Sequence, residues 1–263
     1  SIDRLAEAAG VSQPTVLRML RAFGFSGYKD FKYQLVSELA QSEAEQQGAA
    51  EPMFGYTLRK QDTLEEIPSY MTATAAGMME ETLKNFSVKT YRKTVEAIRK
   101  ARLIDIYSVE NSGVAAQDLL AKLLYLGLPC RYFSDSYYQR ISAGRLTDED
   151  VAVGISYSGA SKDTVDAMRT AKRSGAVTIV ITNFRDSPIC RYADILICTS
   201  QEQFIYGNAI YSRMTQLLIV DMIYMGIIAS DYEHYVGLLD QGEKIVRERA
   251  YPYGAEKRKK KKP

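Results

Sequence analysis

The sequence predicts an α/β protein in which a five-stranded parallel sheet, flanked by helices, follows a smaller all-helical domain. Short β-branched runs alternate with longer helical segments from about residue 103 to residue 198. Near-continuous apolar strands separated by amphipathic helices form parallel sheets that are covered on both faces. The first 35 residues or so are short amphipathic pieces punctuated by Gly10, Gly24 and Gly27, which indicates a separate helical domain.

Length and composition are those of an ordinary globular protein. The chain has 263 residues, of which 46% are hydrophobic and 25% are charged, and this length allows two domains. Neither a run of about 18 apolar residues nor a signal peptide is visible, so we expect a cytoplasmic protein without membrane association. Cys130, Cys190 and Cys198 have no CxxC or histidine-rich companions, so the sequence predicts no disulfide framework, no metal site and no cofactor.

The first 20 residues fit two short helices joined by a sharp turn. Ala6 allows the helices to approach closely, and Gly10 can adopt the positive φ that such a turn needs. We expect Val11, Val16 and Met19 to fill the angle between the helices. This pattern is typical of a helix-turn-helix.

The second of these helices is expected to begin at about Gln13, with Ser12 as its N-cap and Pro14 in its first turn. Its outward face carries glutamine and arginine, which suits a DNA major groove because these side chains pair with adenine and guanine. The residues predicted to contact operator DNA are Ser12, Gln13, Thr15, Arg18, Arg21, Lys29 and Lys32, the two lysines lying near the phosphate backbone.

The start of the chain is only weakly basic. Residues 1–41 carry a net charge of about +1, so affinity for DNA is expected to depend on dimerisation rather than on nonspecific attraction. An ordinary helical hairpin with surface charge is the alternative interpretation.

The remaining elements follow in order. The polar stretch that ends at Pro52 is expected to be a linker, and apolar residues recur at helical spacing from Thr63 to Lys100. A long apolar helix over about 205–228 and a helical segment over 232–249 close the domain. The predicted strands span 103–109, 130–133, 151–155, 177–182 and 195–198, with helices between most of them.

A serine-rich loop between the third strand and the next helix carries the candidate binding chemistry. The hydroxyls of Ser156, Ser158 and Ser161 converge with several backbone N–H groups on a helix amino terminus, which favours a phosphate. Gly159 permits a tight turn and close backbone approach. Such a loop could be mere helix capping, but open α/β sheets bind ligands at the carboxyl ends of their strands. A second loop, over 108–113, follows the first strand, and Ser112 is expected to face the same crevice.

Both regions resemble one family. The string Ala9-Gly10-Val11-Ser12, with Thr15-Val16 and the run from Gly24 to Lys32, resembles the amino-terminal domain of RpiR/MurR-type regulators. In that family at least one more helix precedes this point, so we expect Ser1 to start inside the domain. The two loops, with Ser174-Gly175-Ala176, Thr182-Asn183 and the segment 211–218, resemble the sugar isomerase (SIS) domain over roughly residues 85–230.

The resemblance implies a transcription regulator that binds operator DNA, responds to a sugar-phosphate effector, and forms a homodimer or homotetramer. Carried over by position, Ser156, Ser158 and Ser161 would hold the phosphate, and Ser112 with Asn111 would contact the phosphate or the sugar.

This sequence departs from the family in the first loop, where Gly-x-Gly is common and this chain has Ser108 and Glu110. We expect Glu110 to contact the hydroxyls or an amine of the sugar ring. A structural carboxylate at a helix amino terminus is the alternative.

A SIS domain also occurs in aldose–ketose isomerases, whose enolisation needs a general base. The candidate bases here are Glu110, Glu202 and His234, and no acid–base pair among them is compelling. We therefore expect a noncatalytic sensor, with a sugar-phosphate isomerase as the alternative and a dimerisation module without a ligand pocket as a third possibility.

The expected domain organisation has four segments. Residues 1–41 form the helix-turn-helix domain, 42–62 the linker, 63–250 the SIS-type domain with its leading helices, and 251–263 a basic tail. The region from 247 to 263 holds eight Lys/Arg against two Glu, and we assign it no function.

Overall fold

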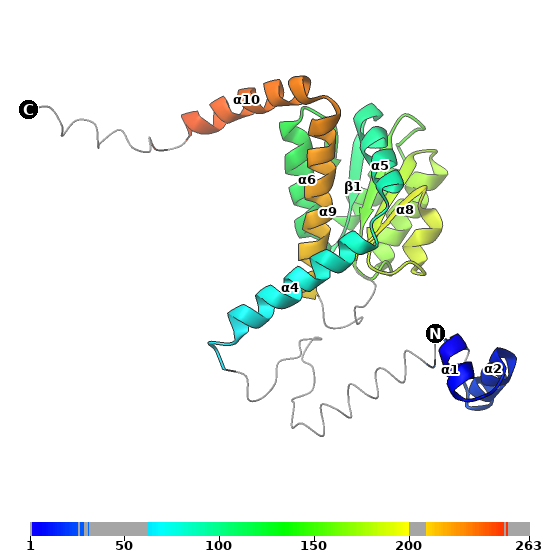
Figure 1. Ribbon diagram of the computed structural model, residues 1–263. Helices are drawn as coiled ribbons and strands as arrows, with labels where there is room; N and C mark the ends of the chain where they lie inside the picture. Colours follow the sequence, from blue (N-terminus) through cyan, green and yellow to red (C-terminus); the bar gives the residue numbers. More distant parts are fainter. Residues whose placement is uncertain are drawn as a thin grey trace, which may run out of the picture. The chain divides into compact units, whose positions relative to one another are not determined.

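The computed structural model describes residues 2–25, 27, 28, 31, 63–199, 209–249 and 251. The chain divides into two compact units between Ile67 and Pro68 (Figure 1). The linker predicted over 42–62 and residues 252–263 of the predicted tail lie outside the described residues, so the four-segment organisation stays a prediction.

The smaller unit contains two short helices around a tight turn. α1 spans Ile2–Ala8 and α2 spans Gln13–Ala22. Gly10 has a φ of +62°, as the sharp turn requires. Ala6, Val16 and Leu20 are buried between the helices, and five partly buried apolar side chains pack around them: Ile2, Leu5, Phe25, Tyr28 and Phe31.

Two of the three residues expected between these helices lie elsewhere. Val11 and Met19 are 42% and 45% exposed, because Val11 sits in the turn and Met19 lies at the margin of the buried face of α2. Leu20, four residues after Val16 on the same face, is fully buried instead. Ser12 occupies the N-cap position with extended dihedrals, but its Oγ lies 2.9 Å from Thr15 Oγ1 and does not accept from the helix backbone.

The larger unit is built on a parallel five-stranded sheet in the order β2-β1-β3-β4-β5. This confirms the predicted fold class. The bounds of β3, β4 and β5 agree residue for residue with the prediction, whereas β1 and β2 are shorter. The strands are β1 Ile104–Tyr107, β2 Cys130–Tyr132, β3 Val151–Ile155, β4 Val177–Thr182 and β5 Ile195–Cys198.

Helices cover both faces of the sheet. One face packs against α5, α6 and α9, which bury Ile98, Leu119 and Ile223 against the sheet. The other face packs against α7, α8 and a 3-10 turn, which bury Ala143, Met168 and Ile189 (Figure 1). The helical elements are α4 Ile67–Lys84, α5 Val88–Lys100, α6 Gly113–Tyr125, α7 Ser136–Ala143, α8 Lys162–Arg173, α9 Ala209–Ser230, α10 Tyr232–Glu248 and the 3-10 turns Glu110–Ser112 and Pro188–Tyr192.

In the described part of the chain, α9 is the one helix long and apolar enough to span a membrane by length and composition. Its window from Arg213 to Ser230 includes two charged residues, Arg213 and Asp221. Ile219, Val220 and Ile223 are completely buried in the core that α9 shares with the sheet. Burial in the core accounts for these apolar residues of α9, while 39% of the window as a whole is buried.

The strand order creates a switch point between β1 and β3. After β1 the chain crosses to β2 on one side, and after β3 it crosses to β4 on the other. The loops that leave the carboxyl ends of β1 and β3 therefore diverge in opposite directions. Open α/β sheets bind ligands at this kind of position.

Candidate functional site

A hydrogen bond connects the loops after β1 and β3. The backbone N–H of Tyr157 donates a hydrogen bond of 3.3 Å to Ser112 Oγ, and Ser112 is buried at the start of α6. Ser112 and the serine-rich loop are therefore in contact, and their role in binding a ligand stays a prediction.

The serines of the β3–α8 loop accept hydrogen bonds from their own loop. Ser156 Oγ accepts from Gly159 N at 3.2 Å, and Ser158 Oγ accepts from Ala160 N at 3.2 Å. Ser161 occupies the N-cap position of α8 without a side-chain cap bond. A hydroxyl that accepts a bond still has its proton to donate, so the loop can offer O–H donors at the positive end of the α8 dipole.

Gly159 makes the tight packing of this loop possible. Its φ is +62°, and a Cβ at this position would lie 2.6 Å from Ser187 Cβ. The carbonyl of Gly159 accepts from Ile189 N at 3.0 Å. No larger residue fits between the loop and the 187–189 segment without a shift, so the glycine sets the loop's shape.

Tyr157 ties the loop to the neighbouring strand. Its carbonyl accepts hydrogen bonds of 3.1 Å from Thr182 Oγ1 and from Asn183 N. Its ring stands edge-on to that of Phe184, with centroids 5.6 Å apart. The serine-rich loop is thus braced from both sides, by Ser112 and by the end of β4.

The loop after β1 has a different character. Glu110 and Asn111 are exposed, and Glu110 has a φ of +54°, which is uncommon for a residue with a side chain. Glycine adopts a positive φ without strain, so Glu110 takes a backbone conformation here that usually favours glycine. Ser108 is completely buried, and its carbonyl accepts from Gln139 Nε2 at 2.8 Å.

Buried polar atoms without a hydrogen-bond partner gather around these loops. Among the described residues there are five. Four belong to Asn183 after β4, Thr164 in the first turn of α8, Gln216 against Ser112, and Gln139 in α7, whose amide donates to the Ser108 carbonyl. The fifth, in Asp150, precedes β3 at the opposite edge. Buried polar groups are nearly always paired in folded proteins, so this clustering marks the edge as a place where a ligand or water completes the bonding.

Gln216 is a site residue that the sequence prediction missed. It lies on α9, is 2% exposed, and donates from Nε2 to Ser112 Oγ at 3.2 Å. An amide directly before the apolar run from Leu217 to Val220 is the signal that could have identified it.

Charged residues at the loops include Glu110, Lys162 and Asp163, and an ion pair connects the strands β1 and β2. The buried carboxylate of Asp105, in β1, is paired with Arg131 at 2.7 Å and accepts from the Tyr107 hydroxyl at 2.8 Å. Burial, together with the charge of Asp105, raises the pKa of Tyr107 well above its usual value. This pair fastens β1 to β2, so its arginine is already committed to a carboxylate.

Of the candidate general bases in the described part of the chain, Glu110 is in the β1 loop and His234 is not. Glu110 is exposed, and Glu202 lies outside the described residues. His234 is on α10, with its ring edge-on to Tyr235 at 5.0 Å. Because α10 begins after α9 ends at Ser230, His234 lies roughly 20 Å along the α9 axis from Gln216.

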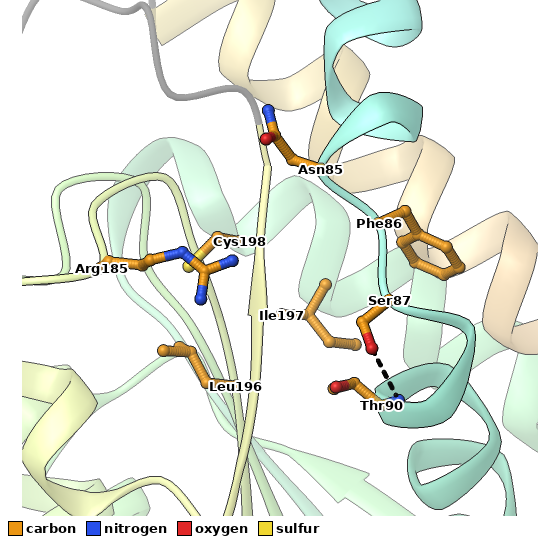
Figure 2. Close-up of a pocket in the computed structure, with 8 residues that line it drawn as sticks. All are labelled: Asn85, Phe86, Ser87, Thr90, Arg185, Leu196, Ile197 and Cys198. Atoms are coloured by element: carbon orange, nitrogen blue, oxygen red, sulfur yellow. Dashed lines mark hydrogen bonds between the residues drawn. The ribbon is translucent and has the colours of Figure 1, made fainter.

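A separate pocket of about 220 Å³ lies beside β5 (Figure 2). Ser87 caps α5 there by accepting from Thr90 N at 3.2 Å. Burial raises the pKa of the Cys198 thiol to about 11, so the thiol is uncharged at neutral pH. The pocket is lined by none of the predicted effector residues. Its lining consists of Asn85, Phe86, Ser87, Thr90, Arg185, Leu196, Ile197 and Cys198.

The predicted DNA-contacting residues of α2 are accessible. Ser12, Gln13, Thr15, Arg18 and Arg21 are all exposed. Lys29 and Lys32 lie outside the described residues. These contacts with DNA stay predictions.

Comparisons with known proteins match both units. The helix-turn-helix domain of the rpiR family matches residues 1–42, and the SIS domain matches residues 97–226. An uncharacterized HTH-type transcriptional regulator from Caldanaerobacter subterraneus subsp. tengcongensis is 30% identical over 247 residues, covering 94% of this chain and 85% of that protein. Another, from Haemophilus influenzae, is 31% identical and covers 88% of this chain and 79% of that protein.

A solved structure shares the fold along nearly the whole chain. The NanR protein of Vibrio vulnificus, complexed with ManNAc-6P, has a TM-score of 0.69 and 23% sequence identity. The match covers 96% of this chain and 87% of that one.

Proposed function

The chain belongs to the rpiR family of helix-turn-helix transcriptional regulators and carries a SIS domain, and we propose that a phosphorylated sugar, bound between the loops after β1 and β3, changes its affinity for operator DNA. The observation that carries this proposal is the bond from Tyr157 N to Ser112 Oγ, because it holds the serines of both loops at one switch point.

The phosphate is proposed to accept from the serine hydroxyls. Ser112, Ser156 and Ser158 each use an oxygen lone pair to accept a backbone N–H, which leaves their protons for an anion. Ser161 and the first amides of α8 add donors at a helix amino terminus. The unpaired buried atoms at this edge support the same assignment.

The sugar is proposed to lie over the β1 loop. Asn111 and Glu110 are the exposed polar residues next to Ser112, and the carboxylate of Glu110 can accept from ring hydroxyls or an amine. That the similar NanR structure holds ManNAc-6P supports a phosphorylated sugar as the class of effector.

Regulation is proposed to work through a cytoplasmic homodimer or homotetramer. Two chains paired through the SIS domains and the helices of residues 63–100 would present two helix-turn-helix units to a palindromic operator. A ligand that binds one arrangement of the pair better than another shifts the equilibrium and, with it, operator affinity. Gln13, Arg18 and Arg21 are the proposed base contacts.

We propose a sensor rather than an enzyme because the described residues bring no acid–base pair to the loops. An isomerase is the second candidate, since SIS domains also serve that chemistry. Turnover of an aldose or ketose phosphate by the purified chain, abolished in Glu110→Gln, would select the isomerase.

Calorimetric titration of the full chain with a panel of sugar phosphates, each paired with its unphosphorylated sugar, tests the binding step. We expect one phosphorylated member to bind, and Ser158→Ala to weaken it about 10- to 100-fold, because a hydrogen bond to a charged group is lost. Ser174→Ala, at the other end of α8, is the matched control and keeps wild-type affinity. Equal binding by Ser158→Ala and wild type would refute the assignment of this loop.

A further inference from the structure

Ser112 is held by two hydrogen-bond donors from different parts of the chain. Tyr157 N donates at 3.3 Å, and Nε2 of Gln216, a residue 104 positions after Ser112, donates at 3.2 Å. A serine hydroxyl has two acceptor lone pairs and one proton. With both lone pairs occupied, the proton of Ser112 must point toward a third partner.

Gln216 sits where an amide is costly. It is 2% exposed, and its neighbours Ile219 and Val220 are fully buried. Its Oε1 is buried and has no partner among the described residues. A leucine or methionine would fill this position in the apolar helix without burying an unpaired carbonyl. The bond to Ser112 is the contact that offsets the cost of burying the amide.

We propose that Gln216 is a positioning residue that fixes the direction of the Ser112 hydroxyl. By donating to Ser112 Oγ, the Gln216 amide prevents the hydroxyl from acting as an acceptor toward a ligand. The hydroxyl is then a donor in advance of binding, as a phosphate oxygen requires. Gln216 acts through Ser112 and does not touch the ligand. The proposal rests on the effector site proposed above.

A double-mutant cycle tests whether Gln216 acts on the ligand through Ser112, an effect that we call the relay. Full-length wild type, Gln216→Met, Ser112→Ala and the double variant are titrated calorimetrically with N-acetylmannosamine 6-phosphate and with inorganic phosphate. Methionine keeps the length of the side chain and removes the donor. We expect Gln216→Met to weaken binding about tenfold in the wild-type background and to change nothing in the Ser112→Ala background. Equal effects in both backgrounds would mean that Gln216 only packs or contacts the ligand itself, and would overturn the proposal.

A charge variant adds a signature that packing does not give. In Gln216→Glu an ionised carboxylate accepts a hydrogen bond from the Ser112 hydroxyl and repels the phosphate. We therefore expect the affinity for the sugar phosphate at pH 8 to be about 100-fold below that of wild type. Toward pH 6 the buried carboxyl group of this variant takes up a proton and can donate to Ser112 Oγ, so the difference in ligand affinity between the variant and wild type becomes smaller. A ratio independent of pH would contradict the proposal. If this variant does not fold, the methionine cycle decides alone.

The outcomes separate this inference from the proposed function. Loss of binding in Ser112→Ala with unaltered affinity in Gln216→Met refutes the relay and leaves the effector site standing. A wild-type protein that binds neither these probes nor any member of the sugar-phosphate panel refutes both.

Discussion

The two loops at the switch point solve the same backbone problem with different residues. Each needs a left-handed residue, and the β3 loop uses Gly159 (φ +62°) whereas the β1 loop uses Glu110 (φ +54°). The first choice is free of strain, while the second costs on the order of 1 kcal/mol. In the proposed function the β3 loop would hold the phosphate, and the β1 loop would place the strained, exposed carboxylate of Glu110 beside the sugar.

The largest effect on stability is expected at Gly159, where the β3 loop leaves no room for a side chain. Gly159→Ala forces a Cβ toward Ser187 and demands a positive φ from alanine, so we expect the free energy of unfolding to fall by about 2–4 kcal/mol. Urea denaturation measures it. Gly237→Ala, in the open on α10, is the control and is expected to gain about 0.5–1 kcal/mol. If Gly159→Ala left the free energy of unfolding unchanged, the β3 loop would not depend on glycine at this position, and the contrast with Glu110 in the β1 loop would fail.

A smaller loss is expected where the loops are joined. Ser112→Ala removes the acceptor for Tyr157 N and Gln216 Nε2, and a buried donor without a partner costs about 1–3 kcal/mol. Thermal unfolding of Ser112→Ala beside the exposed control Ser134→Ala measures the difference. Identical stability in the two variants would mean that the loops are held together by other contacts.

The smallest expected effect on stability is at Glu110, where the substitution is expected to stabilise the protein. Glu110→Gly relieves the left-handed strain, so we expect the free energy of unfolding to rise by about 1 kcal/mol. The same variant is expected to lose preference among sugar phosphates while its affinity for inorganic phosphate stays that of wild type. Glu110→Gln keeps the strain and removes the charge, which separates the two contributions. A Glu110→Gly variant that keeps its sugar preference would remove Glu110 from the site.

The sheet could be predicted from the sequence because its signals are local. β3, β4 and β5 are short apolar runs between turn residues, and their bounds follow from that pattern alone. The Ser156–Ser161 loop was predictable for the same reason, since it follows a strand and precedes a helix.

The remaining features depend on contacts between distant residues. Nothing around Gln216 in the sequence connects it with Ser112, because the two meet only after α9 packs beside α6. The exposure of Met19 depends on which side of α2 meets α1. The left-handed φ of Glu110 contradicts its residue type, so only the folded backbone reveals it.

The central claim is that a sugar phosphate at the joined loops alters binding to operator DNA. The most direct measurement is a fluorescence-anisotropy titration of the full-length protein on a duplex that the same protein has selected from a random-sequence library, with and without the sugar phosphate that binds it. We expect the ligand to change the operator Kd by about 5- to 150-fold, the unphosphorylated sugar to have no effect, and Ser158→Ala to bind the operator without responding. An operator Kd that is the same with and without the bound sugar phosphate would contradict the account.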